Sequence, residues 1–82
     1  MSPDAIDSAG DAKSQVDRLV YMANQIGKFF AHEGAEQAPA SIADHLRKFW
    51  DPRMRARIVA HLKAGGAGLD PFVRRAVEML ER

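Results

Sequence analysis

Three closely spaced arginines are the residues of this chain whose type and spacing best suit recognition chemistry. Arg53, Arg55 and Arg57 follow the only tryptophan, within residues 45–63, where six Lys and Arg stand against one acid. A guanidinium group pairs with carboxylates and phosphates through parallel hydrogen bonds. Nucleic acid is not the expected ligand, because the net charge is only +1 and residues 1–44 are acidic. The arginines therefore predict either a protein interface or a solvated basic surface.

Two large aromatic residues, Phe49 and Trp50, stand directly before these arginines. Trp and Arg are enriched among the residues that anchor protein interfaces. We expect the Trp50 side chain to be exposed on so small a domain. The predicted partner-binding residues are therefore Phe49, Trp50, Arg53, Arg55 and Arg57.

The sequence predicts no catalytic, cofactor-binding or metal-binding residue. His32, His45 and His61 lack the spacing of a known zinc signature, and the chain has no cysteine. The segment 65–68 (Gly-Gly-Ala-Gly) lacks the Lys-Ser/Thr of a phosphate-binding loop, so we interpret it as a helix stop and linker. No serine has a neighbouring His base. The chain is not expected to be an enzyme by itself.

Apolar residues recur at helical spacing in four segments, and none alternates as a strand would. We therefore predict a single all-α domain of about four helices over residues 11–82, preceded by a flexible tail over residues 1–10. The predicted helices run from about Asp11 to His32, from Ser41 as N-cap to Phe49, from Pro52 to about Ala64, and from Pro71 to about Leu80. Residues 33–40, which contain Gly34 and Pro39, are predicted to form a loop.

The ends of the third helix carry the clearest signals. Asp51 is a good N-cap, and Pro52 at the first helical position loses no hydrogen bond. Gly65 and Gly66 predict a left-handed stop at the other end. Because the corner before Asp51 is too tight for an antiparallel return, we expect the second and third helices to cross steeply.

The first helix has two unusual features. Met22 and Phe29 widen its apolar arc beyond one stripe, so the helix either is held on two sides by its own domain or meets another protein. Gly27 within it costs up to about 1 kcal/mol relative to Ala. Close packing against a neighbouring element would explain this glycine.

The length of 82 residues allows only a small core, and without cysteine no disulfide can reinforce it. We expect the isolated chain to be marginally stable or to self-associate, and another protein to stabilise it. The N-terminus has no basic or apolar signal region, and no apolar run approaches the roughly 18–20 residues that span a membrane. The expected location is cytoplasmic, without membrane contact.

Three segments together resemble a known family. They are residues 18–26 (RLVYMANQI), 43–55 (ADHLRKFWDPRMR) and 65–71 (GGAGLDP). The chain is similar over roughly Val16 to Leu80 to the delta subunit of soluble, multi-subunit NAD-dependent formate dehydrogenases that contain molybdenum or tungsten.

The resemblance implies a non-catalytic accessory subunit of a complex that oxidises formate to CO2 with NAD. It implies partners that carry the molybdenum or tungsten pterin, the iron–sulfur clusters and FMN, and a role in assembly, stability or metal-cofactor maturation of the catalytic subunit. The alternative is a free-standing small helical regulator or adaptor that binds an acidic protein or nucleic acid through Arg53, Arg55 and Arg57.

Overall fold

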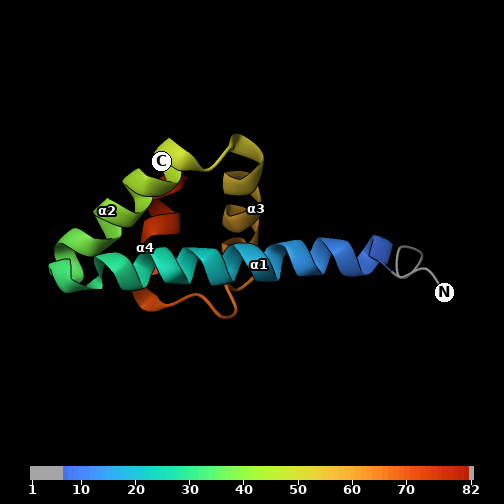
Figure 1. Cartoon of the computed structure of the whole chain (residues 1–82), viewed down its shortest axis with the longest axis horizontal. Helices are drawn as coiled ribbons and strands as arrows, with labels where there is room; N and C mark the ends of the chain where they lie inside the picture. Colours follow the sequence, from blue (N-terminus) through green and yellow to red (C-terminus); the bar gives the residue numbers. More distant parts are fainter. Residues whose placement is uncertain (1–6, 82) are drawn as a thin grey trace.

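A computed structural model describes residues 7–81, and their side chains from Gln15 onward. Four α-helices form, and no strand occurs within residues 7–81, which confirms the predicted all-α fold. The elements are α1 (Asp7–Phe30), the 3-10 turn η2 (Ala31–Glu33), α2 (Gly34–Phe49), α3 (Pro52–Lys63) and α4 (Pro71–Leu80). Figure 1 shows α1 along the length of the molecule, with α2 returning obliquely above it and α3 crossing it.

The long helix α1 begins four residues before its predicted start at Asp11. The first six residues of the predicted tail lie outside the described residues. The N-terminal part of α1 extends past α3 in Figure 1, whereas its second half lies against the other helices. Leu19 and Ala23 face the core from α1.

The predicted loop over residues 33–40 is wrong, because α2 begins at Gly34 and passes through Pro39. The chain reverses at Gly34, whose φ of 92° is strained for residues with a side chain. Pro39 has no N–H to donate to the carbonyl of Ala35, four residues earlier. Arg75 of α4 supplies the missing donor, because its Nη1–H donates to that carbonyl at 2.9 Å. The proline is therefore tolerated inside the helix through a contact from a distant segment.

Ser41 is also placed differently from the prediction. It lies inside α2 instead of capping it, and its hydroxyl donates to Oε1 of Glu33 at 2.5 Å. Glu33 ends η2, so this bond ties the middle of α2 to the turn that precedes it. The serine thus stabilises the start of the helix from a position eight residues after Glu33, the N-cap residue.

Both ends of α3 form as predicted. The carboxylate of Asp51 accepts a hydrogen bond from the backbone N–H of Met54 at 2.8 Å. At the other end, Gly65 has a φ of 124°. The N–H groups of Gly66 and Gly65 donate to the carbonyls of His61 and Leu62 at 2.9 and 3.0 Å, the paired bonds of a glycine-terminated helix.

The core lies where α2 and α4 pack together, with α1 and α3 against them. The fully buried side chains with the largest volumes come from α2, α3 and α4: Ile42, Leu46, Ile58, Val73, Val77 and Pro39. Gly27 of α1 sits close to α4, since a Cβ there would lie 2.6 Å from Cγ2 of Val73. Close helix packing is thus confirmed as the reason for this glycine.

Candidate protein-binding surface

The structure separates the aromatic pair that precedes the arginines. The Phe49 side chain is 71% exposed at the end of α2, whereas Trp50 is only 5% exposed. The expectation of an exposed Trp50 is wrong, because the chain becomes extended at this residue and the ring joins the core cluster that includes Leu46 and Ile58. Partner binding by either residue stays a prediction.

Arg55 supports the corner from within the domain. Its guanidinium donates to the carbonyl of Arg47 at 3.2 Å and also to the carbonyl of Trp50. These acceptors lie at the C-terminal end of α2, where carbonyls lack intrahelical partners and a positive charge is favourable. The contacts of Arg55 therefore indicate a structural role for this member of the predicted site.

Two further arginines act in the same manner at other helix ends. Arg47 of α2 donates to the carbonyl of Met79 at the end of α4, at 2.9 Å. Arg74 of α4 donates to the carbonyls of Gly65 and Gly66 after α3, at 3.1 and 3.0 Å. The ends of three helices are thus each held by an arginine from another helix.

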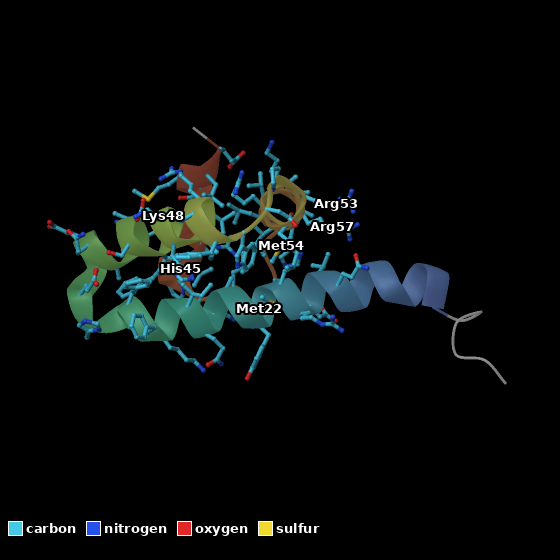
Figure 2. All side chains as sticks on the ribbon, turned by 45° about the horizontal axis from the view of Figure 1, so that its top comes forward. Met22, His45, Lys48, Arg53, Met54 and Arg57 are labelled. Carbon is cyan, nitrogen blue, oxygen red and sulfur yellow. The ribbon has the colours of Figure 1, made fainter. Side chains whose placement is uncertain are left out.

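Arg53 and Arg57 border a groove between α1 and α3. Leu19 and Met22 of α1 and Met54 of α3 line it as apolar residues, and the positively charged residues along it are Arg18, Arg53 and Arg57. Figure 2 shows Arg53 and Arg57 on α3 and Met22 on α1. Arg57 donates to the side-chain carbonyl of Gln15 across the groove.

Four aromatic rings form a row over α1 and α2. The ring centroids of Phe29 and Phe30 are 5.0 Å apart, those of Phe30 and His45 are 6.0 Å apart, and those of His45 and Phe49 are 4.7 Å apart. Phe29 is 70% exposed. The widened apolar arc of the first helix pointed to Phe29, but local sequence could not show that His45 joins the row.

The described residues offer little for other chemistry. Within residues 15–81, whose side chains are described, there is no group of three His, Cys, Asp or Glu side chains that could hold a metal ion. His32 and His61 contact backbone carbonyls, those of Phe29 and Ala67, at 3.0 and 2.8 Å. No helix in this range is long and apolar enough to cross a membrane.

Asn24 joins two segments that are distant in sequence. Its side-chain amide donates to the carbonyl of Gly68 at 2.8 Å and accepts from the backbone N–H of Asp70 at 3.0 Å. The MANQI and GGAGLDP strings therefore meet in the fold through one side chain that uses both its donor and its acceptor. Asp70 itself does not cap α4 through its side chain.

The fold and its surface define a small all-α domain with large aromatic side chains at its surface, a class typical of protein-binding subunits. Comparison with models of protein families gives the particular one. Residues 18–77 match the NADH-dependent formate dehydrogenase delta subunit family, FdsD, and the chain belongs to this family. Neither curated proteins nor solved structures gave a match.

Proposed function

We propose that this chain is a non-catalytic accessory subunit that binds other subunits of an NADH-dependent formate dehydrogenase. Membership of the delta-subunit family over residues 18–77 carries the proposal. The exposed side chains of Phe29 and Phe49 support the binding of another subunit, because large exposed apolar groups mark protein-binding surfaces.

The chain would aid assembly, stability or metal-cofactor maturation of the catalytic subunit. In this proposal its partners are the catalytic and electron-transfer subunits, in the cytoplasm. The molybdenum or tungsten pterin, iron–sulfur clusters and FMN belong to those subunits, which pass electrons from formate to NAD. The cysteine-free sequence agrees with a chain that holds no cluster.

The alternative, a free-standing regulator that uses Arg53, Arg55 and Arg57, gains no support of its own from the structure. Arg55 is engaged by backbone carbonyls of its own domain. Arg57 contacts Gln15, which leaves Arg53 as the exposed member of the three without a hydrogen bond within residues 15–81.

The test is to produce the formate dehydrogenase complex with and without this chain and to measure subunit content, metal loading and formate oxidation. We expect the chain to co-purify with the complex, and its omission to lower metal loading, subunit recovery or both, together with activity. The proposal fails if the chain does not co-purify and if the complex made without it has the same subunit content, metal and activity.

A further inference from the structure

We infer that the chain docks through one continuous face, apolar at one end and cationic at the other, onto an acidic, apolar segment of another formate dehydrogenase subunit. This docking face consists of the aromatic row and the Met22–Met54 groove: Arg18, Met22, Phe29, Phe30, His45, Phe49, Arg53, Met54 and Arg57. The inference rests on the proposed function and specifies the surface and the chemistry of its partner.

Helix geometry makes the two parts of the face continuous. Met22 and Phe29 are seven residues apart on α1, two turns along the same side of the helix. Arg18 lies one turn before Met22 on that side. The neighbouring elements along this edge are α2, which contributes His45, and α3, which contributes Met54 (Figure 2).

The apolar end of the face exposes large side chains that the domain leaves uncovered. Phe29 and Phe49 are 70% and 71% exposed, and Met22 is 36% exposed. The half-buried Phe30 and His45 hold the two phenylalanine rings in one row through their ring contacts. Rigid aromatic rings give a partner a large contact area at a small cost in side-chain entropy.

The cationic end of the face is not neutralised by the described part of the domain. Within residues 15–81 the ion pairs are Lys48 with Asp44 and Lys63 with Glu81, so no ion pair there involves the arginines of the groove. The acid in the groove, Asp51, already accepts the N–H of Met54 as the helix cap. Carboxylates of a partner would complement these positive charges.

Charge selects this face over the hollow on another side of the domain, between α2, α3 and the end of α4. That hollow also carries cations, Arg47, Arg55 and Lys63. Each of them already contacts an acceptor of the domain itself, and the acid Glu81 also lines the hollow. At the groove only Arg57 has such a contact within residues 15–81, with the neutral side chain of Gln15. An acidic partner therefore gains more at the Met22–Met54 groove.

Two matched pairs of variants test the docking face on the full chain. Phe29→Ala and Arg18→Glu change the face, while Tyr21→Ala and Lys28→Glu make the same changes elsewhere on α1. The exposed fraction of Tyr21, 65%, is similar to that of Phe29, and Lys28 is exposed like Arg18. Binding of each variant to the formate dehydrogenase complex made without this chain is measured by titration at two salt concentrations, and folding is checked by circular dichroism.

We expect Phe29→Ala and Arg18→Glu each to weaken binding about tenfold or more, and the two controls to stay within about twofold of the original chain. The affinity of the original chain should fall with salt, and more steeply than that of Arg18→Glu. Folded face variants that bind like the controls would overturn the docking face, while the proposed function would stand.

Two other results are also decisive. If the original chain does not bind the complex at all, the proposed function fails together with the docking face. If Phe29→Ala abolishes self-association in sedimentation but leaves binding to the complex unchanged, a second copy occupies this face and the inference is wrong.

Discussion

Arginine side chains have two different roles in this protein, although the sequence places them in one basic segment. Arg55 has two backbone acceptors within the domain, whereas its neighbour Arg53 is exposed on the docking face. Alternate positions of a helix point in different directions, so spacing alone separates the two residues. Whether Arg53 or Arg55 reaches the end of α2 depends on how the chain turns at Trp50, and this turn is a property of the folded structure.

Replacing these two arginines separately should distinguish the two roles. Arg55→Ala should lower the free energy of unfolding by about 1–3 kcal/mol, because carbonyls at the end of α2 lose a charged donor. Arg53→Ala should change it by less than about 0.5 kcal/mol, as is usual for an exposed position. Urea denaturation followed by circular dichroism measures both. An Arg55→Ala variant of unchanged stability that no longer binds the complex would instead make Arg55 a partner residue.

Among the elements, α1, α3 and α4 could be predicted from local patterns, and α2 only in its second half. The caps at Asp51–Pro52 and Gly65–Gly66 are local signals, and local geometry satisfies them. Pro39 looked like a loop residue because nothing near it in sequence can replace its missing hydrogen bond. The donor is Arg75, whose position relative to Ala35 exists only after α4 packs on α2.

The candidate site likewise has a part that local sequence predicts and a part that depends on packing. The exposure of Phe29 agrees with the widened apolar arc that the sequence shows on the long first helix, and the exposed Phe49 is one of the predicted partner-binding residues. The burial of Trp50 and the joining of His45 to the aromatic row depend on how α2 lies against its neighbours. Local sequence identifies which helices carry more apolar side chains than one buried face needs, and packing decides which of these side chains stay exposed.

The contact between α1 and α4 can be tested with one methyl group. Gly27→Ala should destabilise the fold by about 1–3 kcal/mol through overpacking against Val73, even though alanine gains up to about 1 kcal/mol in helix propensity. The measurement is the midpoint and slope of urea unfolding, with Gln25→Ala, an exposed position on the same helix, as the control.

Adding Val73→Ala to Gly27→Ala should cost less than the sum of the two single changes, since the smaller side chain gives the new methyl room. Additive costs, or a Gly27→Ala variant that is more stable than the original, would show that α1 and α4 do not pack as closely as described.

At the scale of the whole molecule, a small core is combined with a large exposed aromatic surface. The core consists mainly of aliphatic side chains from three short helices and one side of α1. A chain of this size without disulfides seldom gains more than about 3–5 kcal/mol from its core. Covering the docking face by another subunit would therefore add a substantial share of the total stability.

We accordingly predict a free energy of unfolding of about 3–5 kcal/mol for the isolated chain in urea. Binding raises the stability of the bound form by about 2.7 kcal/mol when the partner is present at a hundred times its dissociation constant. Hydrogen exchange of α2 amides, with and without an excess of the complex lacking this chain, measures the difference. A high-melting monomer whose exchange is unchanged by the complex would contradict this expectation.

The arginines that hold the helix ends also bear on how such a chain can vary during evolution. Their acceptors are main-chain carbonyls, such as those of Ala35, Gly65 and Met79, and every amino acid supplies a carbonyl. Mutation at an acceptor position that is not glycine, such as Ala35 or Met79, thus preserves the bond, whereas mutation of the arginine abolishes it. Descendants of this sequence can diverge widely around a few fixed donors and still inherit the same arrangement of helices.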